Sequence, residues 1–501
     1  MSARKVQKRL ASSAPILDKR VKIDHSLLVD TISTPTLSLG PFHSLQDLLQ
    51  DWTLVDLLRT CSRLYRGSYP GVKLKHQEYP ISIFRSNKII PILQCLRIVG
   101  DEELLLYLRF PRPLFKSITS VSLISISHQS FAHFSTLLGV NCTILSLYIC
   151  FVDVVGLSTL VEALRTNTTL KILNLCGNLL RDEDTDSLGE LLKSNRSITD
   201  LKLSGNSITG ENIDSFREGL ANNDALLYLN LENNSLSDAG VGVICNALTI
   251  NRSVTSVNLS GDNDFSDQGI SFLARALRIN KSIKSLHLGR WDGIGIENFV
   301  VHDFAEMLKI NTTLESLNLS GMLQRHISYA SDAAILNSTI TSLDLSANRI
   351  SSKAADALGK NRRIRFLYLS HCIFDFGAAI VLGNSLKVNK SITHLNVCNS
   401  ADFSKNPNPI SNALKVNQTL TFLDFSRNQL NHFGIDSLAK ALKVNKIMKF
   451  LDVSGNSMVQ KCAAALVKAS ARNAVQISFN GTDVEKQEEQ LRQSNVCIVR
   501  V

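Results

Sequence analysis

The chain has 501 residues, 44% of them hydrophobic and 20% charged, and a formal net charge of +10. This length exceeds what one compact core usually organises, and no window of eighteen apolar residues is present, which excludes a membrane-spanning helix. Residues 1–24 carry half of the positive excess. The remainder is expected to spread thinly over the rest of the chain, so a nucleic-acid partner is not expected.

Residues 1–30 form a basic tail that is predicted to be disordered. Lys8-Arg9 and the run Lys19-Arg20-Val21-Lys22 have the spacing of a bipartite nuclear import signal, and a plain basic tail fits the same residues. No apolar stretch follows these charges, as a secretory signal requires. We therefore expect a cytoplasmic protein, with a nuclear location and secretion into a host cell as open alternatives.

Two amphipathic helices are predicted within residues 38–70. Each begins with a capping-box pattern, at Ser44 and at Thr53. The second helix has an apolar stripe at Leu54, Leu57, Leu58, Cys61, Leu64 and Tyr65. Such a stripe must be covered, either by the rest of this chain or by a partner.

This segment resembles an F-box. The resemblance lies in Pro41, Leu48, Leu49, Asp56, Leu57, Leu58, Cys61, Arg63, Leu64 and Tyr65, whereas Gly40 stands where the family usually has Leu. It implies a substrate receptor of a cullin-type ubiquitin ligase, whose Skp-type adaptor would be bound by Leu48, Leu49, Leu57, Leu58 and Leu64. The alternative is a plain helical cap over the end of a repeat stack. Residues 71–115 are expected to add a helical N-terminal cap in either case.

From about residue 141 one phrase returns roughly every 28 residues, in the form N-x-[ST]-[LI]-x-x-L-x-L-x-x-N, and we expect the repeats to span residues 116–480. The first apolar residue of its Leu-x-Leu pair is Leu147, Leu173, Leu201, Leu229, Val257, Leu286, Leu317, Leu343, Leu367, Leu395, Leu423 and Leu451. A fixed period of this length is typical of stacked repeats. Residues 481–501 are expected to form a C-terminal cap or tail.

One repeat, residues 195–222, shows the expected local structure. Leu201 and Leu203 alternate as in a strand, and Phe216 and Leu220 follow at helical spacing. Asn206, at the bend, is expected to hydrogen-bond backbone groups of adjacent repeats. The Asn at the bend is missing in several units, among them those in which Asp262, Trp291, Met322, Cys372 and Ser400 stand.

Asn195 is expected to end the preceding helix in a left-handed conformation. N-x-[ST] sequons abound, and those at Asn141, Asn167, Asn195, Asn251, Asn311, Asn337 and Asn417 fall at this helix end, so we interpret them as part of the repeat rather than as glycosylation sites. None of the ten cysteines forms a C-x-x-C pair, and we expect reduced thiols.

These residues resemble the leucine-rich repeats of the ribonuclease-inhibitor class, which includes ribonuclease inhibitor, the Ran GTPase activator and the repeat domains of NOD-like receptors. The resemblance implies an α/β fold, a leucine-rich-repeat solenoid in which a parallel sheet lines the concave side of a curved horseshoe and helices cover the convex side. It also implies that the concave face binds a protein partner.

The strand residues that flank the inward leucines are predicted to face the concave side. They are small and polar in the middle repeats and aromatic, with acidic neighbours, in the C-terminal third. Exposed aromatics on a rigid sheet are common anchors of protein interfaces, although bulky residues also favour strands. The candidate partner-binding residues are Tyr228, His287, Trp291, Phe366, Tyr368, His394, Phe422, Asp424, Phe450 and Asp452.

Motifs for catalysis are absent from the sequence. There is no G-x-x-x-x-G-K-[ST], no H-E-x-x-H, no G-x-S-x-G and no Cys/His group with metal spacing. We therefore expect neither an enzyme nor a cofactor, and neither a small-molecule substrate nor a membrane partner. A free-standing scaffold or inhibitor is the alternative to the ligase receptor, and a GTPase activator is a third.

Overall fold

The computed structural model describes residues 71–74, 77–80, 95–99, 119–140, 143–150, 157–261, 263–289, 298–322, 337–400, 408–456, 460–471, 473–478 and 498–499. The chain divides into two compact units, Met1–Ile126 and Ser127–Val501. The tail, the F-box-like segment and nearly all of residues 481–501 lie outside the described residues, so the interpretations placed on them stay predictions. No helix in the described ranges is long and apolar enough to cross a bilayer.

The described residues of the first unit are strands. β1 (Gly71–Leu74) pairs antiparallel with β2 (Gln77–Pro80), and β3 (Cys95–Val99) pairs parallel with β4 (Ser120–Ile124). The sequence predicted helices for residues 71–115, and in the described part of that range strands stand instead. A short apolar run fits either pattern, and the β-branched pair Ile98-Val99 favours a strand.

The second unit contains one parallel sheet of short strands that follow one another in chain order. Their bounds are β5 (Ser146–Cys150), β6 (Ile172–Asn174), β7 (Asp200–Lys202), β8 (Tyr228–Asn230), β9 (Ser256–Asn258), β10 (Ser285–His287), β11 (Ser316–Asn318), β12 (Ser342–Asp344), β14 (Phe366–Tyr368), β16 (His394–Asn396), β17 (Phe422–Asp424), β18 (Phe450–Asp452), β19 (Gln476–Ser478) and β20 (Ile498–Val499). β13 (Arg349–Ile350) and β15 (Ile373–Phe374) form a separate parallel pair.

Helices alternate with these strands. Their bounds are α6 (His128–Val140), α7 (Leu157–Thr166), α8 (Asp182–Ser194), α9 (Asp214–Asn222), α10 (Asp238–Ile250), α11 (Asp267–Ile279), α12 (Asn298–Ile310), α14 (Ser352–Lys360), α15 (Ala378–Leu386), α16 (Asn408–Leu414), α17 (His432–Leu442) and α18 (Gln460–Ala471).

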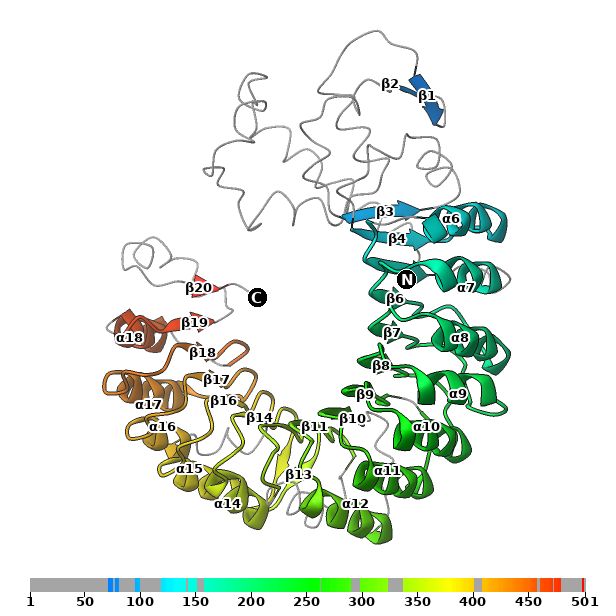
Figure 1. Ribbon diagram of the computed structural model, residues 1–501. Helices are drawn as coiled ribbons and strands as arrows, with labels where there is room; N and C mark the ends of the chain where they lie inside the picture. The colour runs from blue at the N-terminus through cyan, green and yellow to red at the C-terminus, as the bar shows by residue number, and fades with distance from the viewer. Residues whose placement is uncertain are drawn as a thin grey trace. The chain divides into compact units, whose positions relative to one another are not determined.

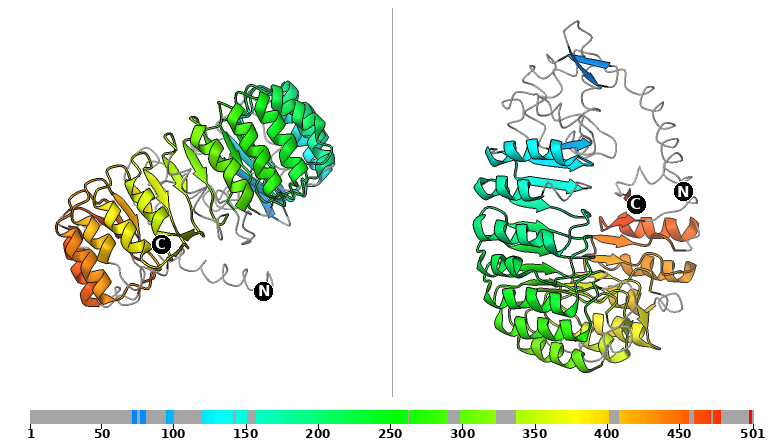
Figure 2. Two further views of the ribbon diagram at one scale, coloured as in Figure 1. Left: turned by 90° about the horizontal axis from the view of Figure 1, so that it is seen from below. Right: turned by 90° about the vertical axis from the view of Figure 1, so that its right-hand side faces the viewer.

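The second unit is a curved stack with its strands on the inner side and its helices on the outer side (Figures 1 and 2). Curvature follows from the spacing of the two layers, because neighbouring strands lie about 4.8 Å apart and packed helices about 8–10 Å apart. The predicted fold is therefore confirmed. The predicted strand positions are confirmed as well, since Leu201, Leu229 and Leu423 are all the middle residues of strands.

The core runs between the two layers through every repeat. The middle residue of each three-residue strand is buried, and at Leu201 and Leu423 its two neighbours are partly exposed on the concave face. Helix residues such as Phe216 and Leu220 close the core from the other side. Since each repeat buries its own leucines against the next, stability is distributed along the stack.

Asn206 shows how neighbouring repeats are joined at the bend. Its amide donates to the carbonyl oxygens of Leu175 and Leu203 at 3.0 and 2.8 Å, and its oxygen accepts from the backbone N–H groups of Asn178 and Leu180 at 2.9 and 3.0 Å. The bonding predicted for this asparagine is confirmed. Buried backbone groups that the short strands leave unpaired thereby gain partners.

The units without Asn at the predicted bend position lose less of the bonding between repeats than the sequence suggested. Asp262 is not the equivalent residue, because the turn is one residue longer and Asn263 donates to Leu231 and Leu259. At two other bends a different side chain makes the same inter-repeat bond. Cys372 donates to Leu345 at 3.2 Å, and Ser400 donates to the carbonyl of the preceding repeat at 3.0 Å.

A second asparagine series lies at the helix ends. Asn195 is buried and donates to the carbonyl oxygens of Leu164 and Asn167 at 2.7 and 2.9 Å, while its own oxygen accepts from Ser197 and Ile198. Its backbone is extended, with φ −80° and ψ 132°, so the predicted left-handed conformation is wrong. Asparagine is needed here for the hydrogen bonds of its side chain. One of these bonds joins it to the Ser two residues ahead, which explains the N-x-[ST] pattern.

The left-handed backbone lies instead in the turn after each strand, one residue before the bend asparagine. Gly177, Gly205 and Gly455 occupy this position with φ between 66° and 69°. In other repeats Ala347 and Arg427 hold φ 56° and 54° at the same place. Glycine is favoured because a side chain adds strain at positive φ.

Candidate partner-binding surface

Four aromatic rings form a continuous row on the concave face of the late repeats. Phe366, His394, Phe422 and Phe450 are paired residue to residue on the neighbouring strands β14, β16, β17 and β18. Each is half-buried, while the leucine that follows it points into the core. We call these four residues the aromatic row.

The rings of the aromatic row stack on one another. Centroid distances are 4.6 Å between Phe366 and His394, 5.4 Å between His394 and Phe422, and 4.7 Å between Phe422 and Phe450. The last pair is close to parallel, with an interplanar angle of 9°. Stacking follows from the in-register parallel strands, which hold equivalent side chains about one strand spacing apart. Ring faces are thus covered, and ring edges remain on the surface.

Burial lowers the pKa of His394 below its ordinary value of 6.5. The imidazole is therefore neutral near pH 7 and belongs to the row as an aromatic ring rather than as a cation. Tyr368 lies beside the row on β14 and is exposed.

Asp424 and Asp452 lie on the concave face next to the aromatic row, and part of their function is local. Asp424 accepts a hydrogen bond from the backbone N–H of Ser426 at 3.0 Å, and Asp452 does the same for Ser454 at 2.7 Å. The same bond is made by Asn174, Asn230, Asn258, Asn318, Asp344 and Asn396. The acidic residues therefore occupy a turn position that asparagine fills elsewhere.

Tyr228 and His287 belong to a different region of the sheet. Lys202 places its ammonium 5.9 Å from the centre of the Tyr228 ring, and burial raises the pKa of Tyr228. Nearby, Asn258 donates to Glu232 at 3.1 Å. Burial lowers the pKa of His287, against the opposing effect of Asp344 and Glu232. The ten candidate residues thus do not form one site, and Trp291 lies outside the described residues.

The sequence itself matches known repeats. A comparison with protein families finds the family described as Leucine Rich repeat at residues 194–211, 336–359 and 416–439. Each match covers parts of the strand, turn and helix that the structure repeats. The chain contains leucine-rich repeats.

Three solved structures illustrate the similarity of this chain to known proteins. Leiomodin-1 actin-binding site 2 is 31% identical over 22% of this chain and 62% of its own, less than two thirds of its length, with a TM-score of 0.20. The yeast Rad7 and Elc1 complex is 14% identical over 95% and 98%, with a TM-score of 0.40. The mouse RP105/MD-1 complex is 13% identical over 86% and 73%, with a TM-score of 0.42. None of the curated proteins compared matches this chain.

The leucine-rich repeats also expose residues that sequence reasoning did not single out. Phe376 and Phe433 are strongly exposed at the starts of α15 and α17, and the ring of Phe433 lies 4.0 Å from that of His432. A sequence signal could have identified both residues. Each is a phenylalanine directly before a glycine at a helix start, and Ala239 and Gln268 stand at this position in earlier repeats.

Proposed function

We propose that this protein is an interaction scaffold whose late leucine-rich repeats bind a protein partner on the aromatic row. The observation that carries the proposal is the stack of Phe366, His394, Phe422 and Phe450 on four consecutive strands, with ring edges left on the concave surface. Leucine-rich-repeat proteins commonly bind protein partners, and aromatic side chains are over-represented among residues that dominate binding energy.

The geometry suits an apolar segment of the partner. The four rings are held by the sheet and by one another, so little side-chain entropy is lost when a partner covers them. Exposed Tyr368 extends the apolar surface and adds a hydroxyl for hydrogen bonding. Asp424 and Asp452 give one border of the row a negative charge, which favours a partner with basic residues beside its apolar ones.

Alanine substitution of the row tests the proposal. Phe366→Ala, Tyr368→Ala, Phe422→Ala and Phe450→Ala in one chain should remove the partners that the wild-type chain captures from cell extract. With a purified partner, each hot spot lost should weaken binding by about 2 kcal/mol, roughly thirtyfold.

The matched control carries Tyr148→Ala and Tyr228→Ala, which remove partly exposed aromatics from the early strands. Both variants should keep the circular dichroism of the wild type, because these side chains lie outside the core. Unchanged partners for the first variant, or equal losses for both, would reject the aromatic row as the binding surface.

A second candidate function is that of a ligase receptor, supported by the F-box-like pattern of residues 38–70. In it, Leu48, Leu49, Leu57, Leu58 and Leu64 bind a Skp-type adaptor while the repeats hold the substrate. The full chain should then bind purified adaptor, and Leu57→Asp with Leu58→Asp should abolish that binding without changing capture by the aromatic row. Failure of the wild-type chain to bind adaptor would leave these helices as a cap.

A further inference from the structure

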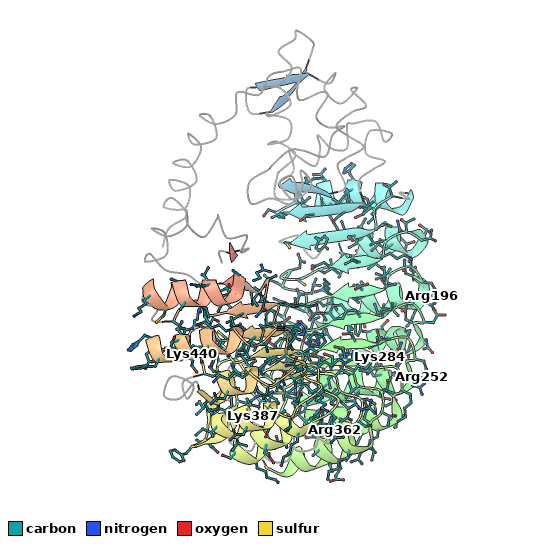
Figure 3. All side chains as sticks on the ribbon, turned by 90° about the vertical axis from the view of Figure 1, so that its left-hand side faces the viewer. Arg196, Arg252, Lys284, Arg362, Lys387 and Lys440 are labelled. Carbon is teal, nitrogen blue, oxygen red and sulfur yellow. The ribbon has the colours of Figure 1, made fainter. Side chains whose placement is uncertain are left out.

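Charge is divided unevenly between the repeats, contrary to the thin spread expected. Residues 157–322 hold 14 Lys and Arg against 21 Asp and Glu, whereas residues 337–478 hold 18 against 7. The late repeats are therefore strongly basic. Figure 3 labels Arg362, Lys387 and Lys440 on the late repeats and Arg196 and Arg252 on the early ones.

Part of this charge gathers where the late helices end. Three consecutive repeats carry a similar short sequence at this position: Lys387-Val388-Asn389-Lys390, Lys415-Val416-Asn417 and Lys443-Val444-Asn445-Lys446. Each asparagine is buried and bonded to the preceding repeat, so the residues around it project outward. We call Val388, Val416 and Val444 with these five lysines the late edge.

The valines of the late edge are unusually exposed for apolar residues. Their exposed fractions are 70% for Val388, 56% for Val416 and 57% for Val444. At the corresponding positions stand the polar residues Thr166, Ser194 and Asn222 in the first repeats, and the similarly exposed Ile250, Ile279 and Ile310 in the middle repeats. The repeat fold therefore does not require an apolar residue here.

The lysines of the late edge have no acidic partner among the residues that the structure describes. Lys387 and Lys415 donate to the amide oxygens of Asn384 and Asn412. The carboxylates of the nearby helices are already used, since Asp356 pairs with Lys360 and Asp436 with Lys440.

In the first two of the early repeats, cations at the same helix ends are paired with carboxylates. Arg165 contacts Glu162 and Glu190, and Lys193 contacts Glu190 and Glu218. A cation at a helix C-terminus is favourable with the helix dipole alone, but that effect accounts neither for the second lysine, Lys390 or Lys446, in two of the three repeats nor for the exposed valines. Each repeat of the late edge combines an exposed valine with at least one lysine that has no acidic partner among the described residues.

Regular stacking places the late edge along one side of the solenoid. The strands that follow these helix ends, β16, β17 and β18, are in register, and the helices that precede them, α15, α16 and α17, pack side by side (Figure 1). Equivalent residues of consecutive repeats therefore project in nearly the same direction. The result is a row of exposed valine side chains with a lysine before each of them and a second lysine after the first and the third.

We propose that the late edge docks this protein on an anionic membrane surface. The valines would lie among the lipid headgroups and the lysines against lipid phosphate and carboxylate groups. A planar anionic surface can contact the valine and the lysine side chains of all three repeats at once. Nucleic acid would meet the lysines only, because valine offers neither a stacking ring nor a polar contact. The contact is peripheral and independent of the aromatic row.

Vesicle sedimentation with the full chain tests this proposal. The wild-type chain should bind vesicles of phosphatidylcholine with about 30% phosphatidylserine and should not bind pure phosphatidylcholine. Lys387→Glu, Lys415→Glu and Lys443→Glu together should weaken binding by about 100-fold, since each cation near the surface contributes about fivefold. Val388→Ser, Val416→Ser and Val444→Ser together should weaken it about tenfold.

The matched control is Lys353→Glu with Lys440→Glu and Lys461→Glu, which changes the net charge equally on helices α14, α17 and α18 of the late repeats but leaves every lysine of the late edge in place. It should bind as the wild type does, and all variants retain the basic tail and should keep their circular dichroism. Equal losses in both charge variants, or no preference for phosphatidylserine, would overturn the proposal. Tight binding of polyglutamate or polyuridylate by a wild-type chain that does not bind vesicles would also overturn the proposal, and would assign the late edge to a protein or nucleic-acid partner.

Discussion

The early repeats, residues 157–322, and the late repeats, residues 337–478, share one scaffold and differ in nearly everything they present outward. In both, a buried asparagine bridges successive bends: Asn206 donates to Leu175 at 3.0 Å and Asn428 to Val397 at 2.8 Å. On the surface, the early repeats are acidic, with Arg165 and Lys193 paired to carboxylates, and the late repeats are basic.

The concave faces of the two regions also differ. Ser256, Ser285 and Ser316 stand on the middle strands where the late strands carry the aromatic row. Positions that join repeats are constrained by buried hydrogen bonds, whereas outward positions are free to vary. Function is therefore to be sought in the outward positions of the late repeats.

The largest expected effect tests whether the two regions depend equally on their cores. Leu201→Asp and Leu423→Asp each place an unpaired charge among buried leucines and should cost more than about 4 kcal/mol. Hydrogen exchange should show loss of protection centred on the altered repeat. Ser256→Asp, at a half-exposed strand position, is the control and should change the melt little. A normal melt for Leu423→Asp alone would mean that the late repeats do not share the early scaffold.

A smaller effect is expected at the bend asparagines. Asn206→Ala and Asn428→Ala should each cost about 2–3 kcal/mol, because buried backbone groups lose their partners. Asn222→Ala removes only an exposed bond to Glu218 and should cost less than about 0.5 kcal/mol. Denaturant midpoints measure all three, and equal costs at all three would refute the bridging role.

The left-handed turn allows a reciprocal test between the regions. Gly205→Ala should destabilise by about 1 kcal/mol through backbone strain, since the added methyl group would meet only Gly177, with its nearest atom at 3.7 Å. Ala347→Gly, at the same turn in the late repeats, should stabilise by up to about 1 kcal/mol, less the added freedom of the unfolded chain. Thermal melts that shift in the same direction for both would contradict this account.

The smallest effect is a pH dependence shared by both regions. Burial lowers the folded-state pKa of His287 and His394 below 6.5, so the unfolded chain takes up protons first as the pH falls. Stability is therefore lost on acidification from about pH 7 through 6.5 toward the lower folded pKa. Replacing both residues by Gln should flatten the dependence of the denaturant midpoint on pH in this window. An identical slope would show that these histidines are not responsible.

The sequence predicted the repeat positions well because the period repeats the same physical constraint at Leu173, Leu201 and Leu229. It did not predict the extended backbone of Asn195, since a helix-ending asparagine fits two conformations and the choice depends on carbonyls of the preceding repeat. The turn function of Asp424 was missed for a similar reason. The sequence alone does not distinguish an aspartate that accepts a hydrogen bond from the backbone two residues ahead from an aspartate that is simply exposed.

By itself, the sequence determined that the chain builds a solenoid, because a period of 28 residues with alternating and helical apolar spacing admits few other ways to bury its leucines. It also placed Phe366, Phe422 and Phe450 on successive strands. Only the tertiary structure decided that these rings stack and that the lysines of the late edge have no acidic partner within the described part of the chain. Stacking depends on strand register, and ion pairing depends on which residues neighbouring helices bring together.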